Sequence, residues 1–568
     1  MSMAAPAAAD APPDAAGRRF SSSAWFWVLL VLVACGWFLT LDVRHLVSSD
    51  EGRYAEIARE MVASGDWVTI RYHGLKYFEK PPLHLWMTAL AYHAFGVGEW
   101  QARLWVALSG AIGLAMTAWA ARRWYGPRVG MLTALVLLAV PTWNLGGHFN
   151  SLDMGVSAAL ACVLAAVLVA QHPQASARSR RSWMLAAWAA MGVAVLTKGL
   201  IGIVLPGLVL VVYTLLVRDW ALWRRLHIVA GTALMLAITA PWFVLVSIRN
   251  PEFAQFFFIH EHWQRYTSSV HRRTGALWYF VPQLLLGFLP WIGLAPRLVA
   301  QVLRPANADG FRPTVLLAVW AGAIFVFFSL SSSKLPGYII PVFPALAVLA
   351  ALALERIEPR HWNRQVLAMA ALALAGLLAS PLVGRLKLGT PENAQYRDYA
   401  VWAAAACAVA VTGMLVAHRL NRRGSLMASI TAYALSMFGA FTIGLLGHES
   451  LGLPRSGVAL VPQIRAVLTP DMPVYSVRVL DHTLPFYLQR TMTMVEHPDE
   501  LAFGVAQEPQ KWLPTLAAFR AAWTDGPHAV AVMSPDTHAM LQAEGLPMVP
   551  LAQDARRVVV TNFNRAAP

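Results

Sequence analysis

Two short clusters of acids, bases and tyrosines follow the first apolar run of the chain. One reads Ser48-Ser-Asp-Glu-Gly-Arg-Tyr54 and the other reads Tyr77-Phe-Glu-Lys-Pro-Pro-Leu83. Carboxylates such as Asp50 and Glu79 can orient a sugar or pair with a cation, and a lysine such as Lys80 can bind a phosphate. The clusters therefore predict a site for a phosphate group beside a sugar or a cation.

The first cluster has the spacing of a capping box, with Ser48 followed three residues later by Glu51. This spacing predicts that a helix begins here and runs along the membrane surface. Arg53 and Tyr54 then lie on the same face as Asp50, one turn further on. The alternative is that Asp50 only complements the helix dipole.

In the second cluster, the two prolines after Lys80 hold the backbone extended and keep Glu79 and Lys80 out of a regular helix. Tyr77 completes this group. A solvated surface salt bridge between Glu79 and Lys80 is the alternative interpretation.

Two further charged residues interrupt apolar stretches. Asp153 follows Asn150-Ser-Leu at the start of one stretch, where it is either a helix cap or a site residue. Lys198 interrupts residues 183–217, and an ionisable group is expensive there unless it faces water or a partner. Lys198 is therefore predicted to line a pocket.

The densest polar cluster spans Phe258–Tyr266. It is not a zincin helix, because position 264 is Gln and the second histidine of that motif is missing. His260 and Glu79 could share a divalent ion such as zinc, although structural hydrogen bonding of His260 is the alternative. Arg265 is a good bidentate ligand for phosphate.

A last cluster, Ser331-Ser-Ser-Lys-Leu-Pro-Gly-Tyr338, precedes another apolar stretch. Lys334 and Tyr338 can flank an anionic headgroup. Each of them singly also fits interfacial anchoring by a snorkelling lysine or an aromatic belt.

The elements that position these clusters are membrane helices. Of 568 residues, 57% are hydrophobic and only 13% are charged. A hydrocarbon core of roughly 30 Å is spanned by about 20 apolar residues. About thirteen spans are predicted, at residues 24–41, 102–121, 129–147, 153–171, 183–197, 199–217, 226–247, 276–300, 313–330, 338–355, 364–384, 399–418 and 425–447.

Arginine clusters in every second loop orient these spans. The positive-inside tendency places the N-terminus in the cytoplasm and all the polar clusters together on the opposite side. The short apolar run 82–96 is predicted to be an interfacial helix within the first outer loop, residues 42–101, because counting it as a span would invert every later loop.

The ends of the chain differ from this membrane part, residues 24–447. Residues 1–23 are predicted to be a disordered cytoplasmic tail. Residues 448–568 are predicted to form a small periplasmic α/β domain, with strand-like runs at 474–477, 529–533 and 558–561. That segment has slightly more acidic than basic residues, so the net charge of +15 belongs to the membrane part and suits anionic lipid and phosphate rather than nucleic acid. The three cysteines lie in separate spans, which excludes a disulfide framework.

Together the motifs resemble a known family. Asp50-Glu-Gly-Arg-Tyr54, Glu79-Lys-Pro-Pro-Leu83, the Asp153 loop, His260-x-x-x-x-Arg265 and Ser333-Lys-Leu-x-x-Tyr338-Ile-x-Pro341 are similar in order and spacing to the lipid A 4-amino-4-deoxy-L-arabinose transferases of Gram-negative inner membranes. These are glycosyltransferases of the C fold, related to protein O-mannosyltransferases. The resemblance covers about the first 450 residues.

The resemblance implies a multi-pass inner-membrane enzyme that transfers aminoarabinose from undecaprenyl phosphate to a lipid A phosphate on the periplasmic face. The transfer inverts the anomeric centre and confers resistance to cationic peptides such as polymyxin. We assign sugar orientation or charge stabilisation to Asp50, Glu79 and Asp153, and the donor phosphate to Lys80, Arg265 and Tyr338. Remaining contacts to sugar or acceptor are assigned to Arg53, Tyr54, Tyr77, Lys198, His260 and Lys334. No cofactor is required, and a divalent ion at Glu79 and His260 is the one candidate metal.

Three alternatives remain from the sequence. Another polyprenyl-phosphate-sugar transferase, such as a protein mannosyltransferase, would share the scaffold but deprotonate a neutral hydroxyl, with Asp50 as the base. A lipid flippase would show Gly/Pro-broken helices in matching halves, which the sequence lacks. A structural scaffold would not need this concentration of acids and bases.

Overall fold

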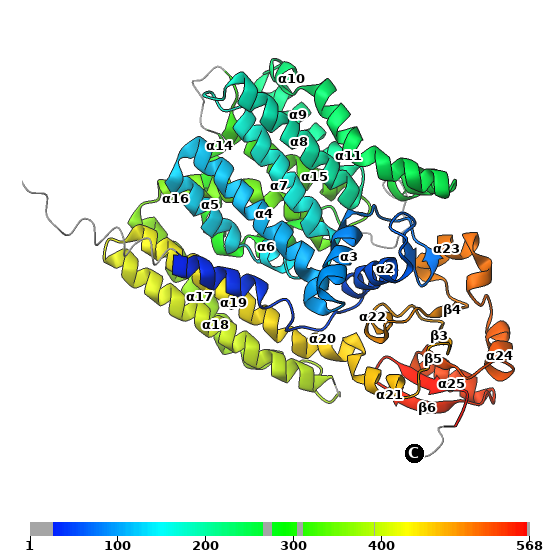
Figure 1. The fold of residues 1–568 in the computed structure, drawn as a ribbon. Coiled ribbons are helices and arrows are strands. Elements are labelled where there is room, and N and C mark those ends of the chain that lie inside the picture. The colour runs from blue at the N-terminus through cyan, green and yellow to red at the C-terminus, as the bar shows by residue number, and fades with distance from the viewer. Residues whose placement is uncertain (1–26, 265–274, 304–309, 391, 565–568) are drawn as a thin grey trace, which may run out of the picture.

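The computed structural model describes residues 27–264, 275–303, 310–390 and 392–564. A large helical bundle is joined at one end to a smaller α/β unit formed by the C-terminal residues (Figure 1). Among the described residues, eight helices are long and apolar enough to cross a membrane, or nine if one bent pair is counted as a single span. The protein is therefore a polytopic helical membrane protein.

The bundle begins with an apolar helix at Trp27–Phe38. Its later helices are α4 (Glu99–Tyr125), α5 (Pro127–Leu138), α6 (Pro141–Gly146), α7 (Leu152–Ala170), α8 (Ala177–Lys198), α9 (Ile201–Val217), α10 (Leu222–Arg225), α11 (Ile228–Arg249), α13 (Phe280–Gly287), α14 (Ala295–Val302), α15 (Pro313–Leu330), α16 (Phe343–Glu355), α17 (Pro359–Val383), α18 (Asn393–Arg422) and α19 (Leu426–Gly447). Three tighter or wider helices join them: the π-helix η1 (Gln255–Gln264) and the 3₁₀ segments η2 (Leu289–Leu294) and η3 (Pro336–Val342).

Each predicted span coincides with a helix, but two spans are broken. The run 129–147 is divided into α5 and α6 before Pro141, and the run 276–300 bends by 86° between Phe280–Gly287 and Leu289–Val302. Proline lacks the N–H that would continue a helix, so Pro141 and Pro290 each fall in the first turn of a new segment. Apolar length alone did not reveal either break.

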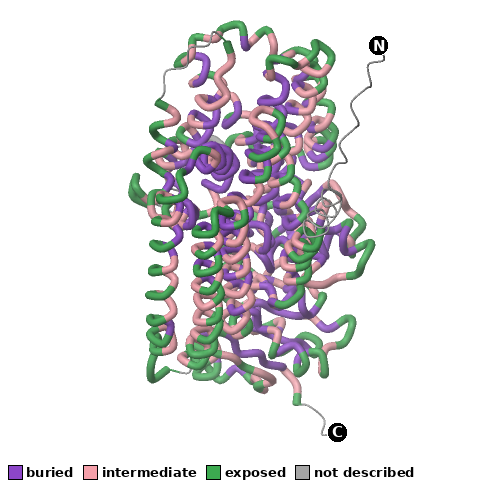
Figure 2. The backbone as a smooth tube through the Cα atoms, turned by 90° about the vertical axis from the view of Figure 1, so that its left-hand side faces the viewer, coloured by how far each residue is buried: buried purple, intermediate pink, exposed green. Residues whose placement is uncertain are grey.

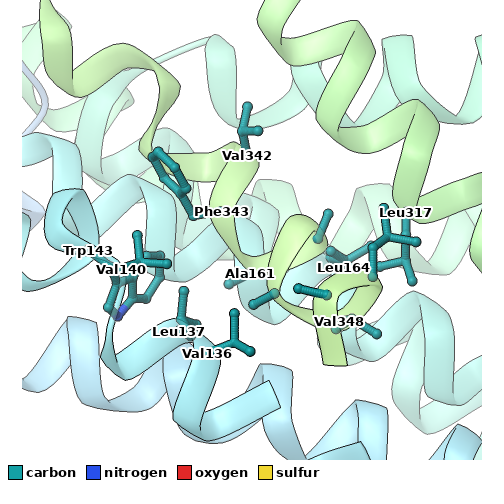
Figure 3. Close-up of a cluster of buried hydrophobic side chains, with 14 of the residues drawn as sticks. Val136, Leu137, Val140, Trp143, Ala161, Leu164, Leu317, Val342, Phe343 and Val348 are labelled. Carbon is teal, nitrogen blue, oxygen red and sulfur yellow. The ribbon is translucent and has the colours of Figure 1, made fainter. Parts of the chain in front are cut away.

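The core of the bundle is centred on α7, which is buried along almost its whole length between α4, α8 and η3. Small residues dominate α7, and they let neighbouring helices approach closely where lipid supplies no hydrophobic driving force. Figure 3 shows Ala161 and Leu164 among the side chains of α5, α6 and α16. Exposed residues run along the outer helices, whereas buried segments gather inside (Figure 2).

The first outer loop folds into a compact unit of α2 (Asp50–Ser64), the antiparallel strands β1 (Arg71–Tyr72) and β2 (Leu75–Lys76), and α3 (Leu83–Phe95). Helix α2 is present where a helix was predicted, and its position along the membrane surface stays a prediction. The helix is buried from Glu51 to Met61, because it packs between α3 and the C-terminal helix α22 (Leu484–Leu488). The helix predicted at 82–96 is present as α3.

The predicted capping box does not form as expected. Within the described residues, the N-cap is Ser49 and its side chain makes no capping hydrogen bond. Glu51 instead pairs with Arg103 of α4, with 2.7 Å between Oε1 and Nε. The carboxylate of Glu51 therefore compensates the buried charge of Arg103 and does not complete the capping box.

The C-terminal unit contains a five-stranded sheet in the order β4-β3-β5-β7-β6. Its strands are β3 (Val474–Val477), β4 (Thr493–Val495), β5 (Val530–Met533), β6 (Val549–Gln553) and β7 (Val558–Thr561). Its helices are α20 (Glu449–Ser456), α21 (Val461–Arg465), α22, α23 (Ala502–Gln507), α24 (Leu516–Thr524) and α25 (Pro535–Ala543), with 3₁₀ turns η4 (Val458–Leu460), η5 (Asp499–Leu501) and η6 (Pro509–Lys511).

The predicted strand runs correspond to β3, β5 and β7, the central strands, which are buried throughout. Strand β3 is parallel to β4 and β5, and β7 is antiparallel to β5 and β6. The sequence did not reveal the outer strands β4 and β6, because β4 is short and β6 is only partly buried and contains Pro550.

Candidate functional site

A cavity of about 570 Å³ lies where α2, the loop before α3, α7, α8, η1, η3 and the C-terminal unit meet. Charged and polar side chains dominate its wall. They are Asp50, Arg53, Tyr54, Glu79, Lys80, Asp153, Lys198, His260, Tyr338, Asp499 and Glu500. Nine of these eleven are residues that the sequence predicted, so folding brings together clusters that are separated by up to 288 positions in the chain.

The first turn of α2 supplies Asp50, Arg53 and Tyr54 to one wall. The buried guanidinium of Arg53 lies between two carboxylates: Nη1 is 3.3 Å from Asp50 Oδ1, and Nε is 2.7 Å from Glu500 Oε1. Burial raises the pKa of Glu500 to about 7, even though Arg53 acts in the opposite direction. Arg53 therefore joins the membrane part and the C-terminal unit across the cavity.

The extended segment before α3 supplies Glu79 and Lys80. Tyr77 donates its hydroxyl hydrogen to Glu79 Oε2 over 3.2 Å, and Lys80 Nζ lies 3.7 Å from the same oxygen. Lys80 also donates to the main-chain oxygen of Glu79 at 3.0 Å. Tyr77 is buried behind the wall, so it orients Glu79 and does not itself line the cavity.

Asp153, Lys198 and Tyr338 form a second charged group. Lys198 Nζ pairs with Asp153 Oδ1 and lies 4.5 Å from the centre of the Tyr338 ring. Gly337 makes this approach possible, since a Cβ there would lie 2.2 Å from Asp153 Oδ2. The helix cap before α7 is Ser151, so Asp153 has a partner on another helix in addition to any capping role.

Two predicted residues have a different outcome. Lys334 lies outside this cavity: it is only 5% exposed, and its Nζ donates to the main-chain oxygen of Ser329 at 2.5 Å. Lys334 is therefore not among the residues that line the cavity, and its contact with a headgroup stays a prediction. The prediction for Arg265 falls outside the described residues.

A metal site at Glu79 and His260 is neither assembled nor excluded. Both residues line the cavity. In the described part of the chain, no group of three or more His, Cys, Asp or Glu residues is arranged to hold a metal ion. Two protein ligands are fewer than the three usual at catalytic zinc.

The sequence did not point to the wall contributed by the C-terminal unit. Asp499, Glu500 and Phe503 line the cavity from η5 and α23. Acids near a Pro-Asp-Glu turn in a soluble segment are normally solvated, and no spacing links them to Asp50. The only sequence signal was the order His497-Pro-Asp-Glu500, which is typical of any turn.

An apolar groove of about 520 Å³ adjoins the polar cavity. Residues that are close in the sequence line the two pockets. Lys198 and His260 line the cavity, and Gly199, Phe257 and Phe258 line the groove. The other groove residues come from α8, α9 and α11 and are almost all apolar. This arrangement can hold a charged head beside a hydrocarbon chain.

Comparisons with known proteins show which proteins this chain is similar to. Residues 460–562 match the model of the aminoarabinose transferase C-terminal domain, and residues 79–245 match that of dolichyl-phosphate-mannose-protein mannosyltransferases. An undecaprenyl phosphate-α-4-amino-4-deoxy-L-arabinose arabinosyl transferase from Aeromonas salmonicida is 32% identical over 66% of this chain and 68% of its own length. The crystal structure of ArnT from Cupriavidus metallidurans bound to undecaprenyl phosphate is 55% identical, with a TM-score of 0.92 over 96% of this chain and 99% of that one.

The chain belongs to the aminoarabinose transferase family. The family resemblance predicted from the motifs is thus confirmed. Coverage varies among the relatives: the chain matches 60% of the length of the Edwardsiella ictaluri transferase, at 31% identity. An archaeal oligosaccharyltransferase, AglB from Archaeoglobus fulgidus, has a TM-score of 0.51 at 13% identity, which is a likeness of fold alone.

Proposed function

We propose that this protein transfers 4-amino-4-deoxy-L-arabinose from undecaprenyl phosphate to a phosphate of lipid A. The observation that carries the proposal is the polar cavity of about 570 Å³ beside an apolar groove of about 520 Å³. A polyprenyl-phosphate sugar has this division between a charged head and a long hydrocarbon chain. The relative from Cupriavidus metallidurans was crystallised with undecaprenyl phosphate.

The donor would place its chain in the groove and its phosphate at Lys80, Tyr338 and Arg265. A phosphate acceptor is already ionised at neutral pH, so the reaction needs no strong general base. The enzyme must instead bring two anionic lipids together and stabilise the departing polyprenyl phosphate by fixed positive charge and hydrogen bonds.

The carboxylates would act on the sugar. Asp50, Glu79 and Asp153 line the cavity from three different segments, and Asp499 and Glu500 add two more carboxyl groups. They suit the ammonium group of aminoarabinose and the positive charge that develops at the anomeric carbon. Arg53 pairs with Asp50 and Glu500, and Lys198 pairs with Asp153, which reduces the repulsion among these carboxyl groups. Attack from the face opposite the leaving phosphate inverts the anomeric centre.

We further propose thirteen membrane crossings, with the N-terminus in the cytoplasm of a Gram-negative cell and the cavity open to the periplasm. The arginine clusters in alternate loops support this orientation. Every predicted span coincides with a helix, including the shorter apolar helices at Trp27–Phe38, Pro127–Leu138 and Ile201–Val217.

Transfer of another sugar from a polyprenyl phosphate to a hydroxyl acceptor is the second candidate. The match of residues 79–245 to the mannosyltransferase model favours it. In that reaction Asp50 would be a general base, and activity would fall as this carboxylate is protonated.

Mass spectrometry of lipid A separates the two candidates. The gene is expressed in a strain that lacks aminoarabinose transfer but makes the donor, with an Asp153→Asn variant at equal membrane abundance as the control. We expect a mass increase of one aminopentose on lipid A with the wild-type chain and none with the variant. Unmodified lipid A in both strains, with the wild-type protein present in the membrane, would overturn the proposed function.

A further inference from the structure

Lys76 contacts three segments that meet at the cavity, although Lys76 itself does not line the cavity. It is the last residue of β2 and lies three positions before Glu79. Its ammonium group is 2.6 Å from Glu252 Oε1, just before the π-helix η1 that carries Phe256 and His260. Its main-chain amide donates to Glu508 Oε2 of the C-terminal unit at 3.0 Å.

The contact from the C-terminal side is unusually close. Gly504 of α23 lies against β2 so tightly that a Cβ there would be 2.5 Å from the main-chain oxygen of Lys76. Glu508 is buried and also accepts hydrogen bonds from Arg71 at 3.0 Å and from Lys511 at 2.7 Å. Burial opposes ionisation of Glu508, but these partners keep its pKa below the ordinary value. Figure 1 shows α23 beside the blue loop that follows α2.

An aromatic contact closes the same junction. Phe503 of α23 stacks on Phe256 of η1 with 3.9 Å between ring centres, and Phe256 in turn stacks on His260 at 5.1 Å. Phe503, Phe256 and His260 all line the cavity. The position of the Glu79–Lys80 loop relative to His260 thus depends on contacts that pass through Lys76 and α23.

We propose that Lys76 is a positioning residue for the donor. Its ammonium and its amide hold the Glu79–Lys80 loop between η1 and the C-terminal unit, which makes α23 part of the active site. The proposal rests on the proposed function for its substrate. Lys76 acts through Lys80 and Glu79, since its own side chain is directed to Glu252 and not into the cavity.

The first test compares Lys76→Met, Glu252→Gln and the double variant. Small displacements of a binding group lower turnover by up to about a hundredfold. We expect each single variant to raise the KM for the polyprenyl-phosphate donor about tenfold. The double variant should be no worse than either, because both single changes remove one interaction. The swapped pair Lys76→Glu with Glu252→Lys should recover part of the loss.

The second test removes no charge. Gly504→Ala introduces a methyl group against Lys76 and should raise the donor KM in the same way, whereas Ala506→Gly, on the exposed side of the same helix, should not. The matched ion-pair control is Arg520→Met with Glu544→Gln, an exposed pair in the same unit. Additive effects of the Lys76 and Glu252 changes, or a normal donor KM for Gly504→Ala, would overturn the proposal.

A binding measurement keeps this test separate from the proposed function. The purified variants are titrated with undecaprenyl phosphate alone, and thermal unfolding of each is recorded beside it. We expect a Kd about tenfold above that of the wild type in both Lys76→Met and Gly504→Ala. The unfolding midpoint should be nearly unchanged in Lys76→Met and lowered in Gly504→Ala, because the added methyl group meets the main chain of Lys76. A wild type that binds undecaprenyl phosphate but transfers no aminoarabinose would reject the proposed function and leave this inference to be decided by the Kd values. Unchanged Kd values in both Lys76→Met and Gly504→Ala would reject the inference.

Discussion

Asp50 and Glu51 are adjacent acids at the start of α2, and they serve opposite purposes. The Asp50 side chain is 42% exposed and lines the cavity, where the guanidinium of Arg53 lies 3.3 Å from it. The Glu51 side chain is 3% exposed and faces α4. Successive residues of a helix point about 100° apart, so one position decides between a site and a core.

The environment of Glu51 is saturated with hydrogen bonds. Arg103 donates from Nε and Nη2 to its two oxygens, and the remaining N–H groups of Arg103 bind the main-chain oxygens of Leu41, Arg44 and His45. Glu51 also accepts from the main-chain amide of Asn150. No N–H group of Arg103 is left for a substrate. On the other side of the helix, the carboxylate oxygens of Asp50 remain accessible to a substrate in the cavity. The Glu51–Arg103 pair is therefore structural, whereas the Asp50–Arg53 pair is available for function.

The largest effect is expected from breaking the structural pair. Glu51→Gln keeps the shape of the side chain but leaves Arg103 as an uncompensated buried charge. Removing one partner of a buried ion pair lowers stability by about 3–5 kcal/mol. Thermal unfolding in detergent should show a strongly lowered midpoint and poor membrane yield. A variant as stable as the wild type would remove the distinction drawn between Glu51 and Asp50.

The matching changes at the cavity should have the reverse signature. Asp50→Asn and Asp153→Asn keep shape and remove charge at the proposed sugar end, so we expect normal folding and a loss of transfer of about 10²–10³-fold, the range for a lost electrostatic contact in a transition state. Transfer rates and unfolding midpoints are measured on the same preparations. Full activity at normal stability would return both residues to a helix-capping role.

Lys80 sharpens the comparison on the donor side. Lys80→Ala removes a charged hydrogen-bond donor from a phosphate, which is worth about 1.5–3 kcal/mol. We expect the Kd for undecaprenyl phosphate to rise by roughly ten- to a hundredfold with little change in stability. Titration of the purified variant checks this, with Arg520→Ala on the C-terminal surface as the control. Equal affinity of Lys80→Ala and wild type would remove Lys80 from the phosphate site.

Glu500 is intermediate between the two cases, because it is buried and also lines the cavity. Its pKa is raised to about 7, so the folded protein retains a proton that the unfolded chain releases near pH 4.5. The contribution of Glu500 to stability therefore falls as pH rises from about 4.5 to 7. Glu500→Gln should be insensitive to this change. Unfolding midpoints of Glu500→Gln and the wild type are measured at pH 5 and pH 8. The variant should be more stable relative to the wild type at pH 8 than at pH 5, and the same difference in midpoint at both pH values would contradict the raised pKa of Glu500.

The smallest effect is expected from chelation. Glu79 and His260 supply two ligands, and an ionised phosphate acceptor needs no metal-activated water. We expect transfer by the purified enzyme to survive EDTA. Complete loss of transfer that one specific divalent ion restores would make Glu79 and His260 metal ligands. They would then bind a cation in the cavity, as Glu51 binds the buried Arg103.

Several features of the site could be predicted because their signals are local. Apolar runs long enough to cross a membrane predicted the helices, and arginines in alternate loops placed the polar clusters on one side. Asp50, Glu79, Asp153 and Lys198 stood out because a charge beside or within a membrane helix needs a reason to be there. All four line the cavity.

Other features were decided only by tertiary packing. Lys198 and Lys334 were both predicted to contribute to the site. Lys198 pairs with Asp153 of another helix, whereas Lys334 donates to the main-chain oxygen of Ser329. Glu500 and Gly504 belong to a soluble unit more than 400 residues from Glu79 and Lys76, and no periodicity or spacing connects them. Whether a side chain avoids lipid or water follows from its own chemistry, so the sequence by itself determines it. Which charge meets which partner depends on how distant segments pack, because an ion pair or a close glycine contact exists only once both segments are in place.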